Sequence, residues 1–161
     1  MHVHSTDDGA AARGCLVECR AVQRLVFDHD YVLPPERVFA YLSEHENLTA
    51  VFGAKIRRLR DGRDGQRNGV DSARELRIGP LPPFVETVTE FVPDEFIRYR
   101  ITKGSPLRDH EGTLRFTARD GGTHLHYEIV FGAVLPGLDA LVAAGLRRNV
   151  SRGLARIDDV A

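Results

Sequence analysis

The C-terminal part of the chain most constrains the fold, because it shows helical periodicity over an unusually long stretch, from Leu135 to Asp159. Its apolar residues recur at the spacing that places side chains on one face of an α-helix; they are Leu138, Leu141, Val142, Leu146, Val150, Leu154 and Ile157. Pro136 falls in the first turn, where a proline is tolerated because its missing N–H would have no partner within the helix. The pattern predicts one amphipathic helix, and the rest of the chain must supply the apolar surface that it covers.

Two residues of this stretch depart from an ordinary core helix. At about 100° per residue, Gly153 lies near the middle of the apolar face and Asn149 lies at its flank. A glycine within a helix costs roughly 0.5–1 kcal/mol relative to alanine, so another interaction should compensate. Either the helix packs closely against a sheet at Gly153, or it covers a cavity that it does not fill.

Alternating apolar and polar residues upstream of this helix predict a series of strands. In the first strand, residues 22–33, Leu25, Phe27, His29 and Tyr31 share one face. Pro34-Pro35-Glu36 then opens a short helix. A second short helical piece is expected over residues 46–51, and further strands over residues 54–60, 70–78, 84–92, 96–102, 110–116 and 124–131.

This order of elements predicts an α+β fold. Successive antiparallel strands form a meander whose apolar face needs a cover, and only the C-terminal helix is long enough to provide it. Alternation leaves the orientation of one strand open. In Phe84–Val92, either Glu86 and Val88 or Val85 and Thr87 point inward.

Length and composition are consistent with one domain. The 161 residues, 42% of them hydrophobic, suffice for a real core, and we assign residues 21–159 to a single domain. Residues 1–20 lack a sustained pattern and are expected to be a loosely held tail. Its two cysteines, Cys15 and Cys19, are too few for a disulfide framework and are not spaced as a redox motif, so free thiols are expected.

Charge and hydropathy exclude some partners. A net charge of −1 gives no electrostatic case for nucleic-acid binding. No apolar run approaches the ~18 residues that a membrane span needs, and the N-terminus lacks the apolar stretch of a secretory signal. These features predict a cytoplasmic protein without stable membrane insertion.

Five short segments carry a family resemblance by their order and spacing. They are Leu33-Pro34-Pro35-Glu36-Arg37-Val38-Phe39, Val88-Thr89-Glu90-Phe91-Val92-Pro93, Arg108-Asp109-His110-Glu111-Gly112, Gly122-Thr123-His124-Leu125 and Leu135-Pro136-Gly137. With them the chain resembles the START-domain and birch-pollen-allergen (SRPBCC) superfamily, and within it the bacterial polyketide cyclase/dehydrase and lipid-transport branch. The resemblance implies a helix-grip fold, in which a seven-stranded antiparallel sheet curls around the long C-terminal helix and leaves a hydrophobic pocket. It implies no particular activity, because the superfamily shares a cavity and not a set of catalytic residues.

Several polar side chains fall on faces that are otherwise apolar. Buried polar groups need a partner or a ligand, and so many of them favour a lined cavity over a closed core. The predicted pocket lining combines these polar residues with apolar neighbours: Phe27, His29, Tyr31, Arg74, Glu86, Tyr99, His110, Leu114, Phe116, Tyr127, Asn149 and Gly153.

Three classes of function fit this pattern. The chain contains no self-sufficient catalytic motif, so we favour a carrier or sensor for a lipid, isoprenoid or polyketide-like molecule, without a cofactor. The alternative is a cyclase or dehydratase in which His29 or His110 acts as general base while a tyrosine or arginine polarises a carbonyl. A protein-interaction module would instead fill its pocket with side chains, and a homodimer is compatible with all three.

A metal site is not expected. His124 and His126 lie on the outward face of the last strand, and the sequence shows no third ligand for them.

The tail supplies the first testable prediction. Removal of residues 1–19 should leave the melting temperature within a few degrees of the full chain, because little apolar surface is lost. Thermal unfolding followed by circular dichroism measures this. A truncated chain that does not fold would show that Leu16 and Val17 belong to the core or to a dimer contact.

Overall fold

The computed structural model describes residues 22–79, 82–133, 135 and 137–161. The predicted tail with Cys15 and Cys19, and also Pro136, lies outside the described residues. Seven strands form one antiparallel sheet in the order β1-β7-β6-β5-β4-β3-β2. Their bounds are Val22–Tyr31 (β1), Lys55–Arg60 (β2), Ala73–Arg77 (β3), Phe84–Val92 (β4), Phe96–Lys103 (β5), Leu107–Arg119 (β6) and Gly122–Ala133 (β7).

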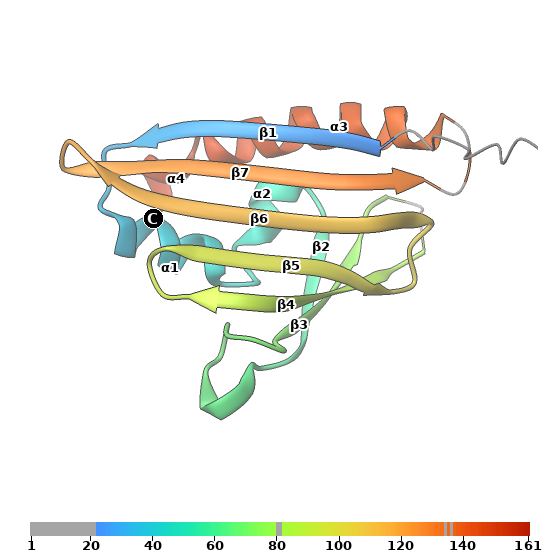
Figure 1. Cartoon of the computed structure of the whole chain (residues 1–161), viewed down its shortest axis with the longest axis horizontal. Helices are drawn as coiled ribbons and strands as arrows, with labels where there is room; N and C mark the ends of the chain where they lie inside the picture. The colour runs from blue at the N-terminus through green and yellow to red at the C-terminus, as the bar shows by residue number, and fades with distance from the viewer. Residues whose placement is uncertain (1–21, 80–81, 134, 136) are drawn as a thin grey trace, which may run out of the picture.

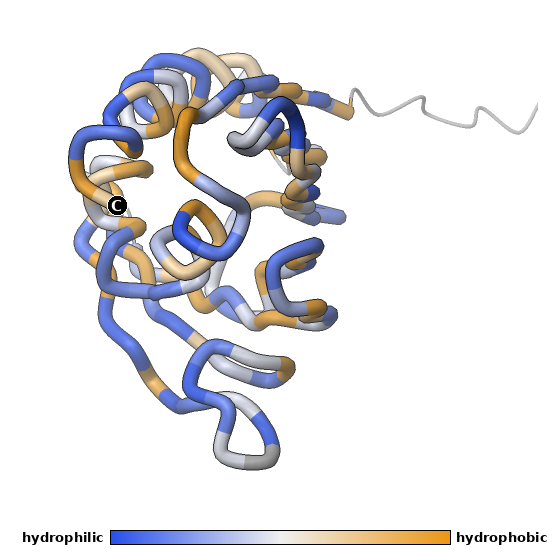
Figure 2. The backbone as a smooth tube through the Cα atoms, turned by 90° about the vertical axis from the view of Figure 1, so that its left-hand side faces the viewer, coloured by the Kyte–Doolittle hydropathy of each residue, from blue (hydrophilic) through white to orange (hydrophobic). Residues whose placement is uncertain are grey.

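The helices lie on one side of this curved sheet (Figures 1 and 2). Helices α1 (Pro35–Ser43) and α2 (Leu48–Phe52) connect β1 to β2, which are the two edges of the sheet. Helix α3 (Leu138–Leu154) packs against α2, β1 and β7, and α4 (Ile157–Val160) follows it. A single-turn 3-10 helix, Arg63–Gly65, stands between β2 and β3. The predicted α+β helix-grip fold with seven strands is confirmed.

The predicted single C-terminal helix is interrupted, and that prediction was wrong. Helix α3 ends at Leu154, and α4 begins at Ile157. The Tyr31 hydroxyl donates to the Leu154 carbonyl oxygen at 3.1 Å, and the Val32 N–H donates to the Asp158 carboxylate at 3.1 Å. Both bonds come from the end of β1 and bind a carbonyl and a carboxylate on the two sides of the break between α3 and α4. The chain turns at this break.

Leu141 also departs from its predicted place on the buried face. It is 72% exposed, whereas Ala143 is buried. Val142 points into the interior instead, and the next residue along a helix is rotated by about 100°. Leu141 therefore faces outward.

The orientation of β4, which alternation left open, is decided by an irregularity in its pairing. Glu86 and Val88 face the interior. The pairing with β5 shifts between Val88 and Glu90, and the extra residue places Phe91 inside as well, with its ring 5.1 Å from that of Phe39. Because of this bulge, β4 follows neither of the two alternating patterns over its whole length.

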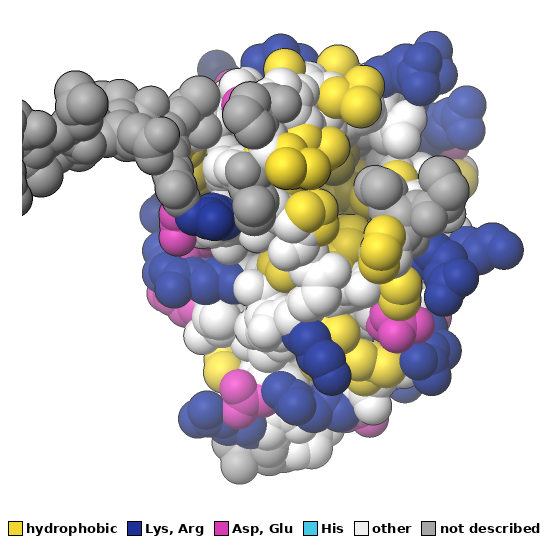
Figure 3. All heavy atoms as spheres, turned by 90° about the vertical axis from the view of Figure 1, so that its right-hand side faces the viewer, with side chains coloured by type: hydrophobic (Ala, Val, Ile, Leu, Met, Phe, Trp, Pro, Cys, Tyr) yellow, Lys and Arg dark blue, Asp and Glu magenta, His cyan; other side chains and the backbone are white. Residues whose placement is uncertain are grey.

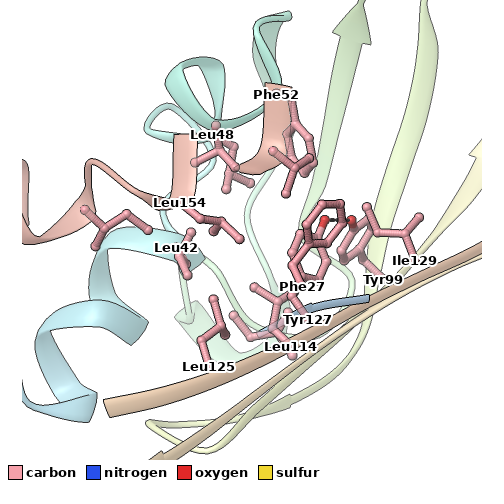
Figure 4. Close-up of a cluster of buried hydrophobic side chains, with 14 of the residues drawn as sticks. Phe27, Leu42, Leu48, Phe52, Tyr99, Leu114, Leu125, Tyr127, Ile129 and Leu154 are labelled. Atoms are coloured by element: carbon pink, nitrogen blue, oxygen red, sulfur yellow. Dashed lines mark hydrogen bonds between the residues drawn. The ribbon is translucent and has the colours of Figure 1, made fainter. Parts of the chain in front are cut away.

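The core lies between the sheet and the helices (Figure 4). Leu42 of α1, Leu48 of α2 and Leu154 of α3 meet Leu125 of β7, and all four side chains are almost fully buried. Burial of one such side chain contributes about 1.5–3 kcal/mol. Apart from a void of about 10 Å³ lined by Leu42 and Leu48, this part of the interior is closed.

Gly153 packs closely, in agreement with the first of its two interpretations, but its neighbour is a helix and not the sheet. A Cβ atom at Gly153 would lie 2.8 Å from the carbonyl oxygen of Val51 in α2, and closer still to its Cα. The Asn149 side chain donates to the Phe52 carbonyl oxygen at 3.2 Å. Both unusual residues of α3 therefore serve its contact with α2.

Substitution of Gly153 tests this contact. Gly153→Leu should destabilise the protein by about 1–3 kcal/mol or more, because backbone of α2 must move to accommodate the side chain. Gly145→Ala is the matched control in the same helix. Nothing lies within 4 Å of a Cβ there, so alanine should add up to about 1 kcal/mol of helix propensity. Urea unfolding measures both; a stable Gly153→Leu would contradict close packing.

Candidate functional site

A cavity of about 80 Å³ remains between the sheet and the N-terminal half of α3. It offers several times the ~10–15 Å³ that one water needs, and its wall is mostly apolar. The lining residues are Phe52, Leu76, Ile78, Pro82, Phe84, Glu86, Tyr99, Ile101, Ser105, Pro106, Leu107, His110, Ile129, Leu138, Val142 and Leu146. Such a wall fits a hydrophobic ligand.

The cavity opens at one end of the sheet. Phe84 begins β4, Leu107 begins β6 and Leu138 begins α3, so these elements meet at the same end of the sheet. Figure 3 shows hydrophobic side chains gathered over this end of the molecule. We call this end of the sheet the mouth of the cavity.

An ion pair stands at the inner end of the cavity. Arg74 of β3 and Glu86 of β4 are cross-strand partners, and Glu86 Oε2 accepts from Arg74 Nε at 2.9 Å and lies 2.8 Å from Nη2. The two side chains are only 4% and 5% exposed. The Arg74 guanidinium also lies 4.8 Å from the centre of the Tyr99 ring, so its charge is compensated on two sides.

A pair of tyrosines adjoins the ion pair, and Figure 4 shows these two side chains pointing toward each other. The hydroxyl groups of Tyr99 in β5 and Tyr127 in β7 form a short hydrogen bond across β6. Gly112 of β6 permits it, since any Cβ there would overlap the Tyr99 ring. Burial raises the pKa of both hydroxyls above the ordinary value. Both groups therefore stay protonated at neutral pH.

His110 lies where β6 is irregular. The strand begins at Leu107, within the predicted loop 103–109, and its pairing with β7 shifts between Arg108 and Glu111. The centre of the His110 imidazole ring lies 5.7 Å from the centre of the Tyr99 ring. Its Nδ1 is buried without a hydrogen-bond partner, and burial lowers the pKa of His110. The side chain therefore presents a neutral imidazole to the cavity.

The structure brings five of the predicted pocket residues together, namely Arg74, Glu86, Tyr99, His110 and Tyr127. Only Glu86, Tyr99 and His110 line the cavity itself. Leu114 lines a smaller void of about 10 Å³ next to Arg74 and the tyrosines. Phe27 lies behind Tyr127, with ring centres 5.8 Å apart.

Other predicted pocket residues lie elsewhere. His29 is half-buried and packs on Tyr31, whose hydroxyl holds the end of α3. Phe116 packs on Phe39 of α1. Asn149 and Gly153 contact α2. These residues share a face with the pocket residues but lie farther along their elements.

Most residues of the apolar wall were not predicted from the sequence. Val142 and Leu146 were predicted to be buried, but only the fold shows that they face a cavity and not a packed core. Ile101, Leu107 and Ile129 come from three different strands. No local pattern marks them as neighbours.

His124 and His126 lie on the outer face of the sheet, whereas His45 is fully buried, with its Nε2 3.3 Å from the Ser72 hydroxyl. His124 Nδ1 lies 2.7 Å from Asp30, and His126 Nδ1 lies 2.7 Å from Asp28. Among the described residues, no group of three or more histidine, cysteine or acidic side chains is arranged to hold a metal ion.

Comparison with known families gives one match. Residues 24–161 match the family described as polyketide cyclase / dehydrase and lipid transport. No curated protein sequence matches the chain significantly.

Solved structures share the fold at low identity. TTHA0849 from Thermus thermophilus has a TM-score of 0.68 and 18% identity over 85% of this chain and 95% of its own. The Zhui aromatase/cyclase from Streptomyces sp. R1128 has a TM-score of 0.64 and 16% identity over 86% and 90%. The di-domain aromatase/cyclase StfQ of the steffimycin pathway has a TM-score of 0.69 and 16% identity over 87% of this chain and 50% of its own.

The buried ion pair is open to a double-mutant cycle. Arg74→Met should cost about 3–5 kcal/mol, because it leaves the Glu86 carboxylate buried without its partner. Arg74→Met/Glu86→Leu should recover most of this loss. Arg57→Met is the control, since the exposed Arg57–Glu75 pair should contribute no more than about 1 kcal/mol. Urea unfolding measures all variants; a double variant less stable than Arg74→Met would contradict the coupling.

Proposed function

The chain belongs to the polyketide cyclase/dehydrase and lipid-transport family, and we propose that it binds a small hydrophobic molecule in the cavity as a carrier or sensor. A lipid, an isoprenoid or a polyketide-like compound has the required chemistry. A cytoplasmic location and function without a cofactor are part of this proposal.

The observation that carries the proposal is the contrast between apolar and polar groups in the lining of the cavity. This lining is mostly apolar, and Glu86, Tyr99 and His110 are its buried polar members. Closed cores avoid such groups, because burial of a polar atom without a hydrogen bond costs free energy. The Nδ1 atom of His110 is in that situation. A ligand with one oxygen at its leading end would supply the missing partner.

The polar residues suggest how such a ligand would be oriented. A neutral imidazole offers one N–H donor and one acceptor, so His110 can bind a hydroxyl or a carbonyl. The Arg74–Glu86 pair leaves no net charge at this end. A neutral oxygen function is therefore favoured over a carboxylate.

The alternative is an enzyme of the cyclase or dehydratase type. His110 supports it, because a buried neutral imidazole with a free nitrogen can act as general base, and Tyr99 could polarise a carbonyl. We favour the carrier, because the other titratable groups nearby already have partners. Glu86 is paired with Arg74, and the two tyrosines bind each other.

A probe-binding experiment tests the proposal. A fluorescent apolar probe should bind with micromolar or better affinity, and Val142→Phe should weaken it at least tenfold, because the ring fills the cavity (1.4 kcal/mol per tenfold). Ala144→Phe is the control, since Ala144 lies on the exposed side of the same helix. Equal affinities for all three proteins would contradict binding in the cavity.

Analysis of the purified protein distinguishes a carrier from an enzyme. Mass spectrometry of an organic extract identifies the molecule that copurifies. With a carrier, that molecule is returned unchanged after incubation. A product that forms with the original protein but not with His110→Gln would establish the enzyme.

A further inference from the structure

The mouth of the cavity exposes apolar side chains to solvent. Leu141 is 72% exposed and Leu135 is 61% exposed. Half-exposed Ile78, Leu107 and Leu138 continue this surface toward the cavity. Figure 3 shows hydrophobic side chains gathered on this end of the molecule. A patch of this kind at a cavity mouth marks a surface that contacts a partner.

Unpaired cations lie at the same end of the sheet. Lys55 of β2 pairs in register with Arg77 of β3, at the end of that strand. Lys103 ends β5, and Arg108 is the second residue of β6. All four side chains are exposed. Within the described part of the chain, none of the four forms an ion pair with a carboxylate.

Several other arginines of the sheet form ion pairs, although Arg60 and Arg115 form none with the described residues. Arg57 is paired with Glu75, Arg100 with Glu111 and Arg24 with Glu128. Of the acidic residues near the mouth, Asp109 follows Arg108 and is exposed, and Asp139 is buried and accepts a hydrogen bond from Gln23 at 2.9 Å, so two carboxylates face four cations. Although the whole chain has a net charge of −1, this end therefore carries an excess of positive charge.

We propose that the mouth docks reversibly on an anionic lipid surface. Apolar side chains between separate cations match a bilayer, where the cations meet lipid phosphates and the leucines enter the boundary of the acyl chains. The contact is peripheral, because no helix in the described residues is long and apolar enough to cross a membrane. This inference rests on the proposed function: a hydrophobic ligand could then pass between bilayer and cavity without crossing water.

Vesicle sedimentation tests the docking. Vesicles of phosphatidylcholine with phosphatidylglycerol should bind the full chain, and vesicles of phosphatidylcholine alone should bind it at least tenfold less. Salt at roughly 0.5 M should release most of the protein, because it shortens the Debye length to ~4 Å. Arg77→Gln/Arg108→Gln should weaken binding at least tenfold, since it removes two cations that an anionic surface attracts. Leu141→Asp should also weaken it.

Matched controls lie at the opposite end of the molecule. Arg152→Gln/Arg156→Gln removes two exposed cations, and Val32→Asp changes an apolar side chain that is 80% exposed. Both should bind vesicles like the original protein. Equal losses in these controls would overturn the inference, as would equal binding to both kinds of vesicle.

The result can be separated from the proposed function. The mouth variants should keep their affinity for the apolar probe, and Val142→Phe should lose the probe but still bind vesicles. Probe binding without vesicle binding would overturn the docking alone. A dimer that Leu141→Asp dissociates in analytical ultracentrifugation, together with no vesicle binding, would assign this surface to a second copy of the chain.

Discussion

The close contact between α3 and α2 is the constraint on which the interior depends. Gly153 brings the two backbones together, and Asn149 binds the end of α2. Tyr31 holds the last turn of α3 from the other side. The N-terminal half of α3 is tied to β1 through the hydrogen bond from Gln23 to Asp139, and there Leu138, Val142 and Leu146 cover the sheet without filling the space beneath them. The cavity follows from an anchored helix and not from a defect in packing.

The polar groups beside the cavity differ in whether they have hydrogen-bond partners. A buried ion pair is weak evidence for stability, since desolvation can exceed the Coulombic gain. Arg74, Glu86, Tyr99 and Tyr127 satisfy one another, whereas the Nδ1 of His110 remains without a partner. The irregular start of β6 brings that imidazole to the cavity. This unsatisfied group thus belongs to a side chain that lines the cavity.

Local patterns identified the polar members of the site better than its apolar members. Arg74, Tyr99 and Tyr127 were recognisable because a polar residue on an apolar face is unusual. Ile101 and Ile129 look like any other core residue, so nothing in the chain marks them as cavity lining. His29 fits the same rule as His110, yet it lies away from the cavity, because alternation gives the face of a strand but not the position along it.

The sequence by itself determined the α+β class, the strand and helix order and the inward faces of the regular strands, since these follow from periodicity and turn residues. Only the tertiary structure decided the break after Leu154, the orientation of β4 through its bulge, and the neighbour of Gly153. Each depends on atoms far away in the chain: the Tyr31 hydroxyl, the register with β5 and the backbone of Val51. Long-range contacts of this kind leave no periodic signal in the residues that they control.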